Sequence, residues 1–224
     1  PWGLLVWRPH WCSRSLFAWP DHTSKRRICH SPAEHHGRHR GGRYNAGMQD
    51  LLEKVREYLP QDRAQVVANA LEYARKAHMG QTRDSGLPYI EHPLTAASYL
   101  ADLSLDSTTI AAALLHDVVE DTGVSIDELR TEFGDDVARL VDGVTKLTKL
   151  ELQHLEGDDR PLPADKGQAE SLRKMLVAMA EDIRVVLIKL ADRLHNMQTL
   201  EPLSPSRQIA IAQETLDIYA PLAH

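Results

Sequence analysis

The stretch Ala-Leu-Leu-His-Asp-Val-Val-Glu-Asp, residues 113–121, places ionisable groups inside an apolar helical run. His116 and Asp117 interrupt a segment that otherwise has the composition of a buried helix, and burying an unpaired charge is costly. Glu120 and Asp121 follow at a spacing of four residues, so on a helix each shares a face with one of the first pair. Because three carboxylates this close repel one another, the stretch favours a bound divalent cation.

The helical pattern extends outward from this stretch. From Asp62 to Met79, small or apolar residues recur at every third or fourth position, which is typical of one face of an amphipathic helix. Residues 151–167 are charged and contain two Gly and two Pro, so a mobile loop is expected there. Further helices are expected from Pro93 to about Leu103, from Asp106-Ser107 to Val118, from Ser125, from Gly134, from Gln168 to Ala180, from Asp182 to Asn196 and from Pro205 to Tyr219.

Composition agrees with an all-α fold. The 224 residues are 42% hydrophobic and 26% charged, which is globular, and only 5% are aromatic, which disfavours a β-sandwich or barrel. No apolar run approaches the roughly 18 residues of a membrane span. The formal net charge of −6 argues against a nucleic-acid-binding protein. We therefore expect a compact multi-helix bundle with neither a membrane nor a nucleic acid as partner.

The first 47 residues differ from the rest. They hold all four Trp, both Cys and six of the 12 His, and their formal charge is +6 against −12 for residues 48–224. They show no helical or strand periodicity, and the Arg/His/Gly run from His35 to Arg43 indicates solvated coil. We expect a disordered or non-native extension, with targeting as an alternative. The body then has no cysteine, which excludes disulfides and thiolate metal ligands there.

Two more ionisable residues stand in comparable settings. His92 directly precedes Pro93 at a loop-to-helix junction, and Asp192 lies in an apolar helical stretch. With His116 and Asp117 they would form a set of two imidazoles and two carboxylates, which suits Mn²⁺, Fe²⁺ or Mg²⁺ better than structural Zn²⁺. The alternative is that Asp192 only pairs with a neighbouring Arg or Lys, and that Glu120 and Asp121 form a charged helix end.

Four motifs, in order along the chain, resemble the HD hydrolase domain of the RelA/SpoT stringent-response enzymes. They are Arg83-Asp-Ser-Gly-Leu-Pro-Tyr-Ile-Glu-His92-Pro, Leu-Leu-His116-Asp-Val-Val-Glu-Asp121-Thr, Val141-Asp-Gly-Val-Thr-Lys146-Leu and Ile188-Lys-Leu-Ala-Asp192-Arg-Leu-His-Asn196-Met. The resemblance runs from about residue 50 to the last residue. It implies a Mn²⁺-dependent hydrolase, with Mg²⁺ or Fe²⁺ as less favoured metals. Such an enzyme removes the 3′-pyrophosphate from (p)ppGpp and leaves GDP or GTP.

The resemblance also implies roles for individual residues. The metal ligands would be His92, His116, Asp117 and Asp192. Glu120 and Asp121 would handle the attacking water. The nucleotide would be contacted by Arg83, Ser85, Asn196 and Thr199, with turn and helix capping as the alternative role of the last three. Lys146 would contact phosphate or else be an ordinary solvated helix lysine.

Some features leave the function open. Asp84 stands where many members of the family have Lys or another residue, and an acid there would weaken or retune nucleotide binding. Residues 48–200 are expected to form the HD domain and 201–224 the start of a helical connection to a synthetase domain that this sequence lacks. Two other functions remain: an HD phosphohydrolase for another nucleotide, and a regulatory module that binds nucleotide without turnover. A cytoplasmic location is expected.

Overall fold

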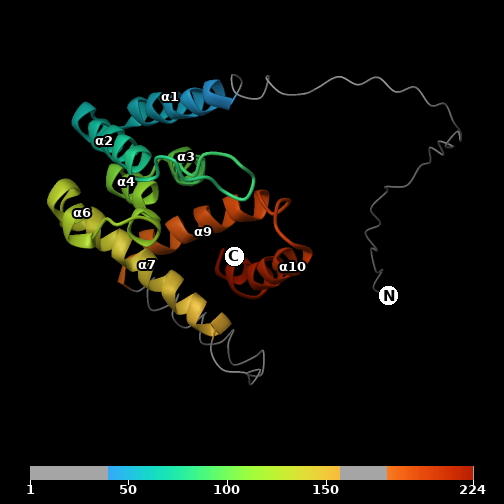
Figure 1. Cartoon of the computed structure of the whole chain (residues 1–224). Coiled ribbons are helices and arrows are strands. Elements are labelled where there is room, and N and C mark those ends of the chain that lie inside the picture. The colour runs from blue at the N-terminus through green and yellow to red at the C-terminus, as the bar shows by residue number, and fades with distance from the viewer. Residues whose placement is uncertain (1–39, 157–180, 224) are drawn as a thin grey trace, which may run out of the picture. The chain divides into compact units, whose positions relative to one another are not determined.

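The computed structural model describes residues 40–156 and 181–223, and helices dominate both ranges (Figure 1). Within these ranges there is no β-strand, only an isolated bridge between Thr82 and Pro88, so the all-α prediction is confirmed. The helices are α1 (Arg40–Tyr58), α2 (Gln61–Ala77), α3 (Glu91–Asp102), α4 (Ser107–Leu115), α5 (Val118–Asp121), α6 (Ile126–Phe133), α7 (Asp135–Glu156), α9 (Ile183–Gln198), α10 (Pro205–Glu214) and α11 (Ala220–Ala223), with a π-helical turn at Thr215–Tyr219.

Helix α4 lies at the centre of the core and leads to the functional site. It packs against α2, α3, α7 and α9, and every residue from Ile110 to Leu115 is fully buried. Its run of three alanines lets these neighbours approach closely. The Asp106 side chain caps its first turn by accepting hydrogen bonds from the amides of Thr108 and Thr109. Side chains at its C-terminal end therefore lie where several helices meet.

The helix expected to run through Val118 is divided at this end. α4 stops at Leu115, and α5 begins after a turn formed by His116 and Asp117. The His116 ring nitrogen Nδ1 lies 2.7 Å from the carbonyl of Ala113, which is the acceptor that the Asp117 amide uses in a continuous helix. The prediction of one helix was therefore wrong. Both turn residues keep right-handed helical backbone angles. The four-residue spacing therefore still places Glu120 near His116 and Asp121 near Asp117.

Three other boundaries differ from expectation. α1 begins at Arg40, so the end of the stretch His35 to Arg43 that was predicted as solvated coil is helical. α7 continues to Glu156, through the start of the loop expected at 151–167. The rest of that loop, the helix expected from Gln168 to Ala180, and residues 1–39 lie outside the described residues. The last expected helix turns π-helical at Thr215, whose hydroxyl donates to the carbonyl of Ile211.

Other sequence signals are confirmed. Ser125 and Glu128 form a capping box at the start of α6, and Gly134 ends that helix with a φ of +86°. The helix expected from Gly134 is α7, and it buries Val137, Leu140, Val141 and Val144. No helix in the described part of the chain combines the length and apolar content needed to cross a bilayer.

A close approach of α7 to α9 fixes the helix that carries Asp192. An added Cβ at Gly143 would lie 2.9 Å from a methyl carbon of Val185, so a larger residue would push the two helices apart. Val185 and Ile188 are buried against the core, and Asp192 follows one turn later on the same helix. The Val-Asp-Gly-Val-Thr motif thus has a packing role in positioning α9.

Candidate metal centre and adjoining pocket

His116 is buried and its ring has a defined tautomer. Its Nδ1 faces the Ala113 carbonyl at 2.7 Å, so Nδ1 carries the proton and donates it in this hydrogen bond. Its Nε2 makes no hydrogen bond with any described residue and lies 3.1 Å from Oδ1 of Asp117. In the neutral ring, a buried lone pair is therefore turned toward a carboxylate, which is the arrangement of an imidazole ready to bind a cation.

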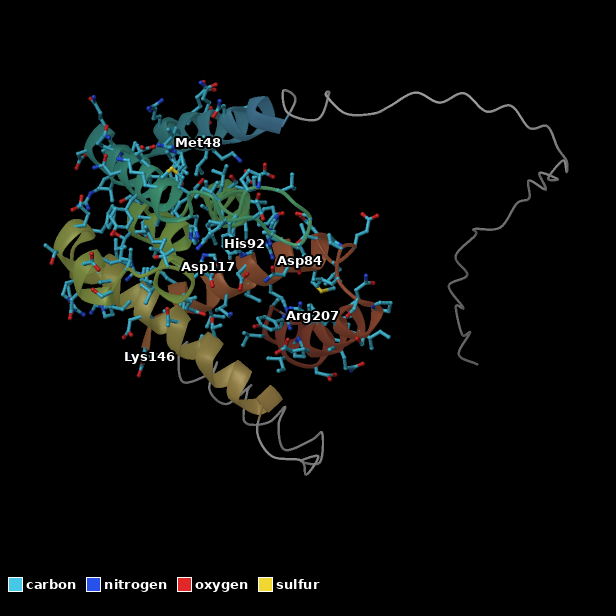
Figure 2. The ribbon with its side chains drawn as sticks, in the orientation of Figure 1. Met48, Asp84, His92, Asp117, Lys146 and Arg207 are labelled. Carbon is cyan, nitrogen blue, oxygen red and sulfur yellow. The ribbon has the colours of Figure 1, made fainter. Side chains whose placement is uncertain are left out.

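His92 approaches the same point from the first turn of α3 (Figure 2). Its side chain is almost fully buried, and its Nε2 lies 3.0 Å from Oδ1 of Asp192 and 3.6 Å from Oδ2 of Asp117. His92, His116 and Asp117 each offer a ligand atom, and these atoms all lie within 4.8 Å of one another. Asp192 adjoins this group through His92. We call these four residues the metal centre.

The chemistry of the metal centre fits a divalent cation. It combines imidazole nitrogens with carboxylate oxygens and includes the orphaned Nε2 of His116. Burial alone would lower the pKa of His116, but the adjacent Asp117 and Asp192 outweigh it and raise the pKa. Burial alone would raise the pKa of Asp192, yet the Lys189 ammonium and the neighbouring histidines hold it well below the ordinary value. The negative charge at the centre thus favours binding of a positive charge.

The acidic pair lies on α5 beside the centre, but its two members differ. Glu120 is half-buried, and burial together with the charge of Asp117 raises its pKa. The side chain of Asp121 is exposed, and its backbone carbonyl accepts a hydrogen bond of 2.8 Å from Nε2 of Gln81. Because a raised pKa makes a carboxylate a stronger proton acceptor, Glu120 is suited to act as a base.

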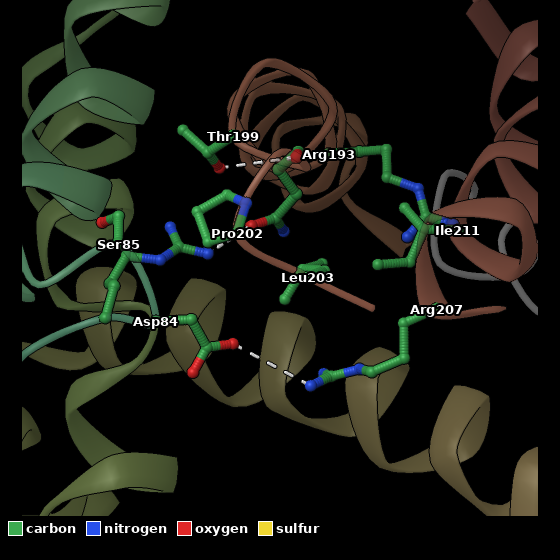
Figure 3. A pocket seen from close by; sticks show the side chains of 10 residues that line it. Asp84, Ser85, Arg193, Thr199, Pro202, Leu203, Arg207 and Ile211 are labelled. Atoms are coloured by element: carbon green, nitrogen blue, oxygen red, sulfur yellow. Dashed lines mark hydrogen bonds and ion pairs between the residues drawn. The ribbon is translucent and has the colours of Figure 1, made fainter. Parts of the chain in front are cut away.

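A pocket of about 210 Å³ adjoins the centre and is bounded by the 83–85 loop, the end of α9 and α10 (Figure 3). It contains four predicted nucleotide-binding residues, Arg83, Ser85, Asn196 and Thr199. Arg83 Nη2 donates to Asn196 Oδ1 at 2.8 Å, and Asn196 Nδ2 donates to Asp192 Oδ1 at 2.6 Å. The pocket is therefore linked to the metal centre by two hydrogen bonds.

The acid at position 84 has a cationic partner in this pocket. Asp84 lies 3.9 Å from Nη1 of Arg207 on α10, and both side chains are exposed. Arg193 also lines the pocket, while its guanidinium binds Glu214 and stacks over the ring of Tyr219. With Arg83, the lining holds three guanidinium groups and one carboxylate, so Asp84 does not make the pocket acidic.

Lys146 does not join the other predicted residues. Its side chain is 70% exposed on α7 and its amine binds Asp142 at 2.6 Å (Figure 2). It lines neither the pocket nor the metal centre. A phosphate contact of Lys146 therefore stays a prediction, with a solvated helix lysine as the alternative.

Three further residues contact the centre without having been assigned to it. The Tyr89 hydroxyl donates to Oδ2 of Asp117 at 2.9 Å, and burial together with Asp117 raises its pKa, so it stays a donor. Lys189 is buried, with its amine 3.4 Å from Asp192 Oδ2 and 3.2 Å from the hydroxyl of Thr148. His195 Nδ1 lies 2.6 Å from His92 Nδ1, and burial with the nearby His92 and Arg83 lowers the pKa of His195 to about 4.

Sequence spacing held a signal for these residues. Lys189 and His195 lie three residues before and after Asp192, and this spacing places both on the same face of a helix as Asp192. Tyr89 lies three residues before His92 in the loop that leads to α3.

Comparison with known proteins agrees with this geometry. The family model described as an HD domain matches residues 70–224. The chain belongs to the HD-domain family. It matches the HD region of the larger RelA/SpoT proteins, and divalent metal binding is implied for this HD domain.

Individual relatives cover much of this HD domain. The bifunctional (p)ppGpp synthase/hydrolase SpoT of Escherichia coli strain K12 is 49% identical over 176 residues, which are 79% of this chain and 24% of that protein. A GTP pyrophosphokinase of Myxococcus xanthus is 50% identical over 170 residues, 76% of this chain and 22% of that protein. The chain thus spans about a quarter of the length of these relatives.

A solved structure provides a similar comparison. It is described as a metazoan ortholog of SpoT that hydrolyzes ppGpp and plays a role in starvation responses. It matches with a TM-score of 0.52 and 27% identity, and the match covers 71% of this chain and 86% of that chain.

Proposed function

We propose that this HD domain hydrolyses ppGpp or pppGpp at the 3′ position, releasing pyrophosphate and leaving GDP or GTP. The observation that carries the proposal is the placement of a set of buried imidazole and carboxylate groups next to an arginine-lined pocket. The imidazole and carboxylate groups suit a cation and the cleavage of a phosphate ester, and the arginine-lined pocket suits a nucleotide. The described activities of the E. coli relative and the metazoan ortholog support the choice of substrate.

His92, His116, Asp117 and Asp192 are the proposed metal ligands, with Mn²⁺ as the preferred ion. When bound, the cation would offset the charge of the phosphoryl oxygens and make a water molecule easier to deprotonate. The tautomer of His116, fixed by the Ala113 carbonyl, keeps one ligand nitrogen available. Tyr89 orients Asp117 through its hydroxyl, which donates to one carboxylate oxygen.

The proposed reaction is attack of water on the phosphorus bonded to the 3′ oxygen. Glu120 accepts the proton from water as the new oxygen–phosphorus bond forms, and its raised pKa suits it to that task. The bond between phosphorus and the 3′ oxygen breaks, the attacked group leaves as pyrophosphate, and the 3′ oxygen takes up a proton from solvent to become the hydroxyl of GDP or GTP. Asp121 lies one residue further and assists in orienting the water.

The pocket is proposed to hold the guanosine. The Arg83 guanidinium is fixed by Asn196 and presents a planar cation on which a base can stack. Ser85 and Thr199 supply hydroxyls in the same lining, and Arg207 offsets the charge of Asp84. We propose a cytoplasmic location, as expected from the sequence. We further propose that residues 201–224 lead toward a synthetase domain in a longer protein.

The direct test incubates the full chain with ppGpp and Mn²⁺ and separates the products by anion exchange. We expect equal amounts of GDP and pyrophosphate, loss of turnover on chelation, and recovery when Mn²⁺ is restored. A panel of deoxynucleoside triphosphates and cyclic nucleotides is run in parallel. Turnover of these but not of ppGpp would show a phosphohydrolase with another substrate. Tight ppGpp binding without pyrophosphate release would show a regulatory module.

A further inference from the structure

Helix α9 presents His195 and Asn196 between the pocket and the metal centre. We propose that His195 is a positioning residue that holds His92 as a metal ligand, and that Arg83 fixes His195 in the state required for this. The proposal rests on the metal centre of the proposed function. It gives Arg83 a role beyond the nucleotide, because the same guanidinium then helps to organise the ligands of the ion.

The two histidines share one proton in the hydrogen bond between them. His92 Nδ1 and His195 Nδ1 are 2.6 Å apart, so one nitrogen donates and the other accepts. Arg83 Nη1 lies 3.3 Å from the same His195 Nδ1, and a guanidinium has only donors. An N–H on His195 Nδ1 would therefore face a second donor. The stable assignment makes His195 Nδ1 the acceptor, with its one lone pair shared between the closer donor His92 and the more distant donor Arg83.

The proton on Nδ1 of His92 determines the state of the other nitrogen of the same ring. If His92 Nδ1 carries the proton, then Nε2 of the neutral ring has a lone pair, and this is the nitrogen that faces Asp192 at 3.0 Å and Asp117 at 3.6 Å. A ligand histidine commonly donates its other ring N–H to an acceptor, which fixes both the tautomer and the orientation of the ring. Here the acceptor is a second imidazole.

A parallel link runs through the neighbouring residue. Arg83 Nη2 donates to Asn196 Oδ1 at 2.8 Å, and Asn196 Nδ2 donates to Asp192 Oδ1 at 2.6 Å. One guanidinium thus reaches His92 through His195 and Asp192 through Asn196. A nucleotide that binds Arg83 will change the hydrogen bonds through which this guanidinium reaches His92 and Asp192. Nucleotide binding and metal binding are therefore coupled, and the coupling is reciprocal.

The test measures Mn²⁺ binding to the full chain without nucleotide, by titration calorimetry with electron paramagnetic resonance of free Mn²⁺. We expect His195→Leu to weaken Mn²⁺ binding about 10- to 100-fold, as is usual when the acceptor behind a ligand histidine is lost. His195→Asn, which retains an acceptor oxygen, should restore most of the affinity. Leu194→Gln, at an exposed neighbouring position, should leave it unchanged.

Arg83→Ala is the variant that separates the proposal from a purely nucleotide-binding role. We expect it to weaken Mn²⁺ binding several-fold even when no nucleotide is present. Unchanged Mn²⁺ affinity in both His195→Leu and Arg83→Ala would overturn the proposal. If the unmodified chain binds no Mn²⁺, the metal centre itself is wrong. If it binds Mn²⁺ but releases no pyrophosphate from ppGpp, only the proposed reaction fails.

A spectroscopic measurement decides the point without any substitution, in case His195→Leu does not fold. Zn²⁺ binds nitrogen and oxygen sites more tightly than Mn²⁺ and is diamagnetic. Long-range ¹H–¹⁵N spectra of the Zn²⁺-loaded chain should show His92 protonated at Nδ1 and His195 protonated at Nε2. A proton on Nδ1 of His195 would contradict the proposal.

Discussion

Replacing Asp117 by Asn should lower kcat/KM for ppGpp about a thousandfold or more, because removal of a ligand charge costs several kcal/mol of transition-state stabilisation. Asp117 lies between both histidines, 3.1 Å from Nε2 of His116 and 3.6 Å from that of His92. The amide keeps the volume of the side chain and an oxygen that can accept from Tyr89. The loss should therefore appear in turnover and Mn²⁺ affinity together, with little change in the folded fraction.

Asp192→Asn should have a similar effect on turnover. It should also reduce stability, since the buried Lys189 ammonium then loses its carboxylate neighbour. Asp142→Asn is the matched control, because Asp142 pairs with exposed Lys146 on α7 and touches neither part of the site. Activity and circular dichroism are measured on all three variants. Full turnover in both Asp117→Asn and Asp192→Asn would refute the ligand assignment.

The second large effect is expected for Glu120→Gln. Loss of a general base typically lowers the rate by about 10²- to 10⁴-fold, and glutamine cannot accept the proton from water. Glu120 is not one of the residues whose ligand atoms all lie within 4.8 Å of one another. Mn²⁺ affinity and KM should therefore change little while kcat falls, which distinguishes this variant from Asp117→Asn.

The control for this variant is Glu57→Gln, at an exposed position on α1. Single-turnover measurement at saturating Mn²⁺ isolates the chemical step from product release. Should kcat for Glu120→Gln remain within a factor of two to three of the parent, the proton would have another acceptor. Asp121 would then be the first candidate, since it follows in the same helix.

The candidate ligand side chains could be singled out in the sequence because buried charge is costly. His116, Asp117 and Asp192 each stand in an apolar helical setting, and this contrast is visible in the sequence. Their meeting point depends on packing, above all on the contact of α3 and α9 with the buried helix α4, which local periodicity does not encode. The break between α4 and α5 was missed because the His116 side-chain hydrogen bond is local and leaves the apolar pattern continuous.

Residues with two interpretations were harder to assign. Lys146 stands in a motif, yet its side chain pairs with Asp142 four residues earlier, which is what helical spacing alone predicts. His195 follows Asp192 by three residues, but its importance depends on His92 and Arg83, which lie more than a hundred residues away in the chain. Such contacts arise only after the helices are packed.

Diffraction from crystals of the chain grown with Mn²⁺ tests the metal centre most directly. The anomalous signal of Mn²⁺ should show one strong peak within bonding distance of Nε2 of His92, Nε2 of His116 and carboxylate oxygens of Asp117 and Asp192. A peak located elsewhere, or one that His92 and Asp192 do not contact, would contradict the account.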